Sequence, residues 1–220
     1  MAHPNLLWQL VDSTFPMGGF SHSAGLEAAV QLGEIQGSEE LLHYFEELLW
    51  NVGGAALPFT SAAHASPAAL PQLDWRCDAF LSSNVANRAS RAQGGAFLRA
   101  AAQAFGDPVG RIEDQVRAQA LPAHLAPVLG CALASLGMAL EDAQRLLLFL
   151  ALRGAVSAAV RLGVVGPLEA QRLQARAGRT LEEVLAARAH ASLEEVSQVT
   201  PLLDLLQGHQ DRLYSRLFQS

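Results

Sequence analysis

The chain has 220 residues, of which 50% are hydrophobic and only 6% aromatic, and its formal net charge is −6. This length suits one domain with a substantial core. All 15 basic residues are arginine, which excludes a P-loop lysine, a Schiff-base lysine and a kinase phosphate clamp. The acidic balance lacks the basic footprint of a nucleic-acid-binding protein. Cys77 and Cys131 form no CxxC pair, so we expect neither a disulfide framework nor a cysteine metal site.

Two segments bear on location. The first five residues lack the basic and apolar regions of a secretory signal. The most apolar run, from Leu146 to Leu152, lies between two arginines and is too short to span a bilayer. We therefore expect a cytoplasmic protein with no membrane partner.

The first half of the chain reads as a series of helices. A short apolar helix begins at Leu6 and ends near Pro16, and a second covers 24–32. Ser38 is expected to cap a longer helix whose apolar stripe runs to Val52, with Gly53-Gly54 ending it. Another begins after Ser66-Pro67, and its pattern fades after Gly94-Gly95.

The second half continues in the same way. Helices are predicted over 111–120, over 122–138 and over 141–162, and the last of these is apolar on most faces, as expected for the centre of a bundle. Capping boxes are expected at Thr180–Glu183 and at Ser192–Glu195. No alternating strand pattern flanks any turn signal. The sequence therefore predicts an all-α, single-domain helical bundle.

The segment from Pro16 to Glu27 places serine, histidine and glutamate close together, which raises the possibility of a hydrolase using Ser21 and His22. A nucleophile elbow needs G-x-S-x-G after a strand, and neither Ser21 nor Ser23 satisfies this. The alternative interpretation is structural: glycines turn the chain, Ser23 caps a helix and Gly25 allows a close approach. A partner surface is a further possibility.

Metal binding is weighed in the same way. The seven histidines form no HExxH motif and no close pair. His22 and His209 are the weak candidates for contact with a nickel ion, because imidazole suits that metal. We expect no tightly bound metal or cofactor, and a nickel-binding chaperone acting alone stays an alternative.

The C-terminal segment is unusually apolar for a chain end. Leu213, Tyr214, Leu217 and Phe218 recur at helical spacing, and Arg216 lies among them. An exposed stripe of this kind would be a sticky patch, so it must dock on its own core or on a partner. We divide the chain into a helical domain, 1–208, and a partner-docking tail, 209–220.

These segments resemble the UreF family of urease accessory proteins. The first matches a P-x-G-x-F-S-H-S-x-G-L-E block, and the last matches a terminal string of the Tyr-Ser-Arg-Leu-Phe-x-Ser type. Between them, Arg88-Ala89-Ser90 resembles an R-x-A-S element, and His124 to Gly130 resembles an H-x5-G element. The region 161–168 departs from the family's R-L-x-P-L-G-Q block, because its proline is displaced.

The resemblance implies a helical, non-enzymatic homodimer. It would bridge a UreD-type (UreH-type) accessory protein and a UreG-type GTPase, so that the complex handles nickel, the partner handles GTP, and apo-urease receives the metal. The residues implied in partner binding are Tyr214, Arg216, Leu217, Phe218 and Ser220. The residues implied in the motif or an interface are Phe20, Ser21, His22, Ser23, Gly25, Glu27, Arg88 and Ser90.

Overall fold

The computed structural model describes residues 5–220, and these contain helices and no strand. The first five residues, where the sequence lacks a signal pattern, lie almost wholly outside this range. The α-helices are α1 Leu6–Val11, α2 Leu26–Gln31, α3 Ser38–Ala55, α4 Leu57–Ala65, α5 Leu70–Phe80, α6 Asn84–Phe105, α7 Asp107–Ala118, α8 Leu125–Ser135, α9 Leu140–Arg161, α10 Pro167–Arg188 and α11 Pro201–His209. Short 3-10 turns are η1 Gly19–Ser21, η2 Pro67–Ala69, η3 Leu193–Glu195 and η4 Gln210–Arg212. The predicted all-α class is confirmed.

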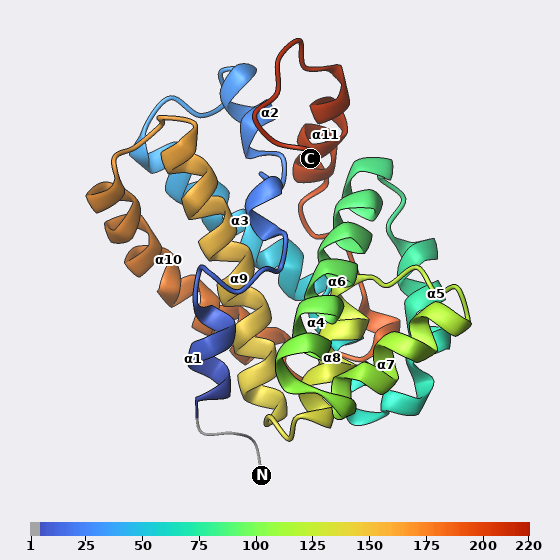
Figure 1. Cartoon of the computed structure of the whole chain (residues 1–220). Helices are drawn as coiled ribbons and strands as arrows, with labels where there is room; N and C mark the ends of the chain where they lie inside the picture. Colours follow the sequence, from blue (N-terminus) through green and yellow to red (C-terminus); the bar gives the residue numbers. More distant parts are fainter. Residues whose placement is uncertain (1–4) are drawn as a thin grey trace.

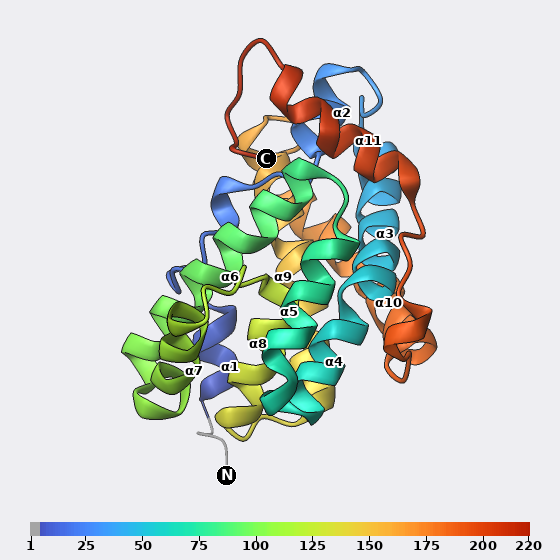
Figure 2. The same ribbon diagram turned by 90° about the vertical axis from the view of Figure 1, so that its right-hand side faces the viewer.

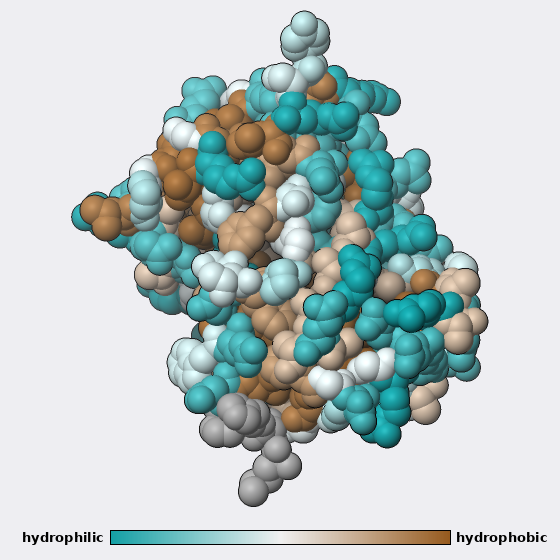
Figure 3. Space-filling model, in the orientation of Figure 1, coloured by the Kyte–Doolittle hydropathy of each residue, from teal (hydrophilic) through white to brown (hydrophobic). Residues whose placement is uncertain are grey.

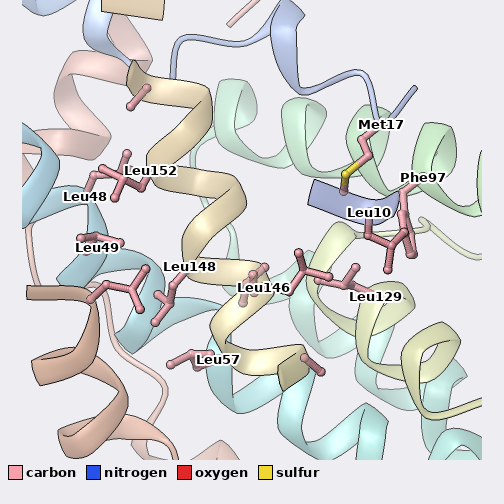
Figure 4. Close-up of a cluster of buried hydrophobic side chains, with 14 of the residues drawn as sticks. Leu10, Met17, Leu48, Leu49, Leu57, Phe97, Leu129, Leu146, Leu148 and Leu152 are labelled. Carbon is pink, nitrogen blue, oxygen red and sulfur yellow. The ribbon is translucent and has the colours of Figure 1, made fainter. Parts of the chain in front are cut away.

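Helix α9 forms the centre of the bundle (Figure 1). It packs against α3 and α10 on one side and against α4 and α8 on another. Figure 4 shows why it is buried: Leu146, Leu148 and Leu152 project from it into side chains of the surrounding helices. Each such leucine removed from water contributes roughly 1.5–3 kcal/mol. Among the described helices α9 has the length and hydropathy of a membrane span, but 56% of its most apolar window is buried inside the bundle.

Two helices that are far apart in sequence, α2 and α11, lie side by side in the upper part of the molecule (Figure 2). α11 also contacts α6. The C-terminus ends close to α2 and α11, whereas α1 lies in the lower part of the molecule (Figure 1). On the face shown in Figure 3, apolar side chains gather at the upper left, over the end of α9 and the beginning of α10.

The expected helix breaks at paired glycines are wrong. Gly53 and Gly54 lie inside α3, and Gly94 and Gly95 lie inside α6. A Cβ on Gly53 would be 2.3 Å from Val184 Cγ1 of α10, and one on Gly94 would be 2.1 Å from the Ala123 carbonyl oxygen. Gly53 and Gly94 are therefore points of close contact with another segment rather than helix stops, because a side chain would not fit at either position.

Helix starts were predicted with mixed success. The Ser192–Glu195 capping box is present with both of its hydrogen bonds, but it opens only the 3-10 turn η3. The Thr180 box is wrong, because Thr180 is a buried residue within α10. Ser38 is the first residue of α3 rather than its cap, and Ser66 makes no capping bond. The expected helix over the last eight residues is also wrong: no helix follows Arg212.

The neighbouring glycines of α6 provide a matched test of close contact. Gly94→Ala should destabilise the protein by about 1–3 kcal/mol, because its methyl group would overlap a backbone carbonyl. Gly95→Ala should stabilise it by up to about 1 kcal/mol, since its Cβ would meet only the flexible end of Arg99. Urea denaturation of both variants checks this, and equal effects would contradict the assignment of Gly94 to a tight contact.

Candidate functional site

The signature segment near the N-terminus and the C-terminal tail bind each other. Ser23 N donates to the Ser220 carbonyl oxygen at 2.5 Å, and Gln219 N donates to the Ser21 carbonyl oxygen at 2.8 Å. The Ser23 hydroxyl also donates to Ser220 O, at 3.2 Å. We call the contact between residues 20–27 and residues 210–220 the clasp. It joins the two most conspicuous motifs of the sequence in one place.

Glu27 lies at the centre of the clasp. Its side chain is buried, with 2% of the residue exposed. One carboxylate oxygen accepts from Leu217 N at 2.6 Å, and the other accepts from Phe218 N at 3.1 Å and from Gln210 Nε2 at 2.6 Å. A buried carboxylate without donors would be strongly destabilising, and here three N–H groups supply them. The tail backbone therefore follows Glu27 instead of forming a helix.

His22 forms the second polar contact of the clasp. The ring is buried, and Nδ1 lies 2.5 Å from Ser220 Oγ. Burial lowers the pKa of His22, and the positive charge of Arg88 lowers it further. The neutral imidazole is thus the form that fits the folded clasp.

Arginines hold the aromatic residues of the clasp. The Arg161 guanidinium lies over the Phe218 ring, 4.3 Å from its centroid, and also donates to the Phe20 carbonyl oxygen. Arg153 lies 5.8 Å from the centroid of Phe20. Cation–π contacts of this kind contribute about 0.5–2 kcal/mol. They fix Phe218, which is 4% exposed, and leave Phe20 39% exposed.

An ion-pair cluster secures the tail to α6. Arg88 donates to both carboxylate oxygens of Asp211, at 2.9 and 3.3 Å, and Arg216 donates to Asp211 Oδ1 at 3.0 Å. The bond from Arg88, aided by the charge of Arg216, holds the pKa of Asp211 below its usual value. Both arginines are about half exposed, so these bonds position the tail more than they stabilise it.

A second polar network lies below the clasp. Ser90 Oγ accepts from Leu125 N at 3.3 Å and lies 3.1 Å from His124 Nδ1. His124 Nε2 lies 3.0 Å from Asp78 Oδ1. Asp74, which is fully buried, accepts from Ala123 N and His124 N at 2.7 and 2.8 Å. Burial raises the pKa of Asp74, whereas hydrogen bonds from Asn87 and His124 lower the pKa of Asp78.

Known proteins are similar to this chain over nearly all of its length. The UreF family profile matches residues 35–178. Urease accessory protein F of Arabidopsis thaliana is 39% identical over 97% of this chain and 91% of its own, and that of Oryza sativa subsp. indica is 38% identical over 96% and 83%. Urease accessory protein UreF of Trichodesmium erythraeum is 30% identical over 96% and 94%.

The chain belongs to the UreF family.

The structure of this UreF-family chain shows where the residues of each predicted motif lie. Ser21, His22, Ser23 and Glu27 line the clasp directly, and Gly25 adopts φ +93° where a Cβ would lie 3.0 Å from Gln207 N of α11. The close approach predicted at Gly25 is thus confirmed. Ser23 is not the N-cap of α2, which is Gly25, although its hydroxyl accepts from Glu27 N at 3.4 Å.

The central motifs also meet. Arg88 contacts the tail and Ser90 contacts His124, so the R-x-A-S and H-x5-G elements are packed against each other. Gly130 of the second element faces α4, where a Cβ would be 2.2 Å from the Thr60 carbonyl oxygen. Asp74 and Asp78 were not predicted from the sequence. Their position among the apolar residues of α5, beside Leu73 and Cys77, was the signal that could have found them.

The tail residues divide into two groups. Phe218 and Ser220 are buried in the clasp. Tyr214 is fully exposed and contributes nothing to docking on this chain, whereas Leu217 is 52% exposed and only partly covered. Self-docking and exposure, which the sequence presented as alternatives, thus apply to different residues of one segment.

The structure does not assemble the hydrolase considered from the sequence. His22 pairs with Ser220, and Glu27 is occupied by the tail, so neither serves Ser21 as a base or orienting acid. His209 Nδ1 lies 3.1 Å from the Leu205 carbonyl oxygen, on α11. Within residues 5–220 no three His, Cys, Asp or Glu side chains are grouped to hold a metal ion.

Replacement of Glu27 tests the clasp. Glu27→Gln should weaken tail docking by about 1–3 kcal/mol, because an amide nitrogen then faces a buried backbone N–H. Faster hydrogen exchange at Leu217, Phe218 and Gln219 is the expected result. Glu34→Gln, at an exposed residue, is the matched control and should leave these amides protected. Unchanged exchange in both variants would contradict the central role of Glu27.

Acid should loosen the clasp through His22. Because docking of the tail lowers the pKa of His22, the imidazole binds a proton more readily when the tail is released than when it is docked. Docking should therefore be intact above the ordinary histidine pKa, about 6.5, and should weaken as pH falls below it. Hydrogen exchange at the Gln219 amide, measured from neutral pH down to pH about 5, tests this. Most carboxyl groups titrate below this pH range, so they contribute little to the change. The dependence should disappear in His22→Gln, and its persistence there would assign it to another group.

Proposed function

We propose that this chain is the scaffold of a urease maturation complex. The family carries an accessory role in urease maturation, and the similarity to two relatives spans 96–97% of this chain and 83–91% of theirs. On this proposal the chain performs no chemistry itself. The complex carries nickel as cargo, a partner hydrolyses GTP, and the chain acts in the cytoplasm.

The observation that carries the proposal is the divided tail. The clasp holds Phe218 and Ser220, which leaves the segment between Asp211 and Leu217 on the surface. Tyr214 and Leu217 expose apolar surface there, and Arg212 and Arg216 supply positive charge on a chain whose net charge is −6. A tyrosine beside arginine is typical of an interface hot spot. We assign partner docking to this tip, with residues 209–220 as the docking element.

The partners follow from the family. We propose that the tip binds the UreD-type (UreH-type) protein or the UreG-type GTPase, that a second copy of this chain completes a homodimer, and that apo-urease receives nickel from the assembly. Phe20, Arg88 and the other signature residues shape the surface next to the tip. The exposed apolar area over α9 and α10 in Figure 3 leaves room for more than one partner.

Co-expression with a urease operon that lacks its own UreF tests the proposal. The intact chain should restore urease activity, whereas a chain truncated before Tyr214 should not. Because truncation also removes the buried Phe218 and Ser220, the double variant Tyr214→Ala, Leu217→Ala is the sharper test. It should lose partner capture in pull-downs with UreD-type and UreG-type proteins while its unfolding midpoint stays unchanged, since both side chains are exposed.

Trp75→Ala provides the matched control. Trp75 is a large residue on α5 that is 53% exposed and lies outside the tip. This variant should retain partner capture and urease activation. Full activation by the Tyr214, Leu217 double variant would refute the tip as the docking element, and activation without any added chain would refute the scaffold role.

A further inference from the structure

Positive charge gathers around the C-terminal tail, although the chain as a whole carries a net charge of −6. Arg88 contacts the tail through Asp211, and Arg161 contacts it through the ring of Phe218. Within residues 5–220 the carboxylates of the tail, and of the side chains bonded to it, are those of Asp211 and Glu27. We call the four guanidinium groups of this region the arginine cluster: Arg88 of α6, Arg161 of α9, and Arg212 and Arg216 of the tail.

Two arginines of the cluster share one carboxylate. Asp211 Oδ1 accepts from Arg88 Nη2 at 2.9 Å and from Arg216 Nη1 at 3.0 Å. Both arginine side chains are about half exposed. One carboxylate balances the charge of one guanidinium, and each guanidinium carries five N–H donors. Positive charge and N–H groups of this pair therefore remain available to a molecule outside the chain.

The other two arginines have no acidic partner on this chain. Arg161 and Arg212 are exposed, and no ion pair within residues 5–220 includes either of them. Arg161 is fixed by the ring of Phe218 and by its bond to the Phe20 carbonyl oxygen, and neither contact neutralises its charge. Glu27 is buried and accepts its hydrogen bonds from N–H groups of the tail, so it pairs with none of the four arginines.

Exposed apolar side chains lie among these charges. Tyr214 stands between Arg212 and Arg216 in the tail, and Leu217 follows Arg216 directly. Large apolar residues beside arginine are typical of protein interfaces. A nucleic acid or an anionic lipid surface instead attracts a long basic stripe, usually on a basic domain, whereas this chain is acidic. The arrangement therefore favours a protein partner that carries negative charge.

We propose that the arginine cluster selects an acidic protein surface. Carboxylates of the partner pair with Arg212 and Arg216, and an apolar hollow between them takes Tyr214 and Leu217. This inference rests on the proposed function and specifies the charge of the partner that the tip binds. Arginine suits the role because its planar fork binds a carboxylate through two parallel hydrogen bonds. Opposite charges also accelerate encounter, so the cluster acts on the association rate as well as on the affinity.

Reversal of one charge tests the proposal. The probe is the UreD-type or UreG-type protein that the intact chain captures, and the association rate is measured at rising NaCl concentration. The rate for the wild type should fall as salt screens the charges. Arg212→Glu should associate at least about tenfold more slowly at low salt, and its rate should depend less on salt. Its unfolding midpoint should stay unchanged, because Arg212 is exposed and outside the Asp211 ion pairs.

Arg111→Glu is the matched control. Arg111 is also exposed and also takes part in no ion pair within residues 5–220, but it belongs to α7, in the lower part of the molecule (Figure 1). The two variants change the net charge of the chain by the same amount. Arg111→Glu should therefore associate like the wild type, whereas a general effect of net charge would slow both variants.

Equal rates for the two variants, or association that does not depend on salt, would overturn the proposal. If Arg212→Glu keeps the capture that the Tyr214, Leu217 double variant loses, the tip still docks a partner and only the acidic character of that partner is refuted. If both keep it, the tip itself is refuted. Oligouridylate and vesicles containing phosphatidylserine are the polyanion probes. Binding of either one that Arg212→Glu abolishes would assign the cluster to a polyanion and overturn the proposal.

Discussion

The buried carboxylate of Glu27 is the interaction on which the upper part of the molecule depends. A charge at this depth is tolerated only when hydrogen-bond donors surround it. α2 supplies the residue, but two of the three donors are backbone N–H groups almost two hundred positions later in the chain. The C-terminal tail must therefore return to the signature segment, and its path follows from that requirement. Gln210, which donates to the same carboxylate, sets where α11 gives way to the tail.

Glycines impose a second constraint, through contact distance. Gly25 admits α11, Gly94 admits the loop before α8, and Gly130 admits α4, each at a separation that a methyl group would prevent. Short side chains have a different effect on one side of the bundle, where Ala86 and Ala89 of α6 and Ala151 and Gly154 of α9 line a groove of about 240 Å³.

The sequence predicted what local patterns determine. Apolar periodicity placed α9 and α3, and the Ser192–Glu195 box formed as expected. The sequence failed where a contact with a distant segment determines the structure. Gly53 and Gly94 appeared as helix breaks because the segments they touch, α10 and the loop before α8, are remote in sequence. The tail appeared helical for the same reason, since the apolar spacing of Leu213 to Phe218 contains no information about Glu27. Ser90 and His124 were each identified as weak motifs, whereas their contact depends on the packing of α6 against α8.

The groups of the tail that dock on the signature segment differ from the side chains that the tail exposes. Leu217 N, Phe218 N, Gln219 N and Ser220 O make its contacts with the signature segment, and these main-chain groups are available in almost any sequence. The side chains that docking does require are Phe218, Ser220 and Asp211. Nothing in the fold requires a tyrosine at 214 or a leucine at 217, yet both are large, apolar and exposed. Exposed side chains of this kind add little stability to the fold, and the proposed function gives them a role in contacts with a surface outside this chain.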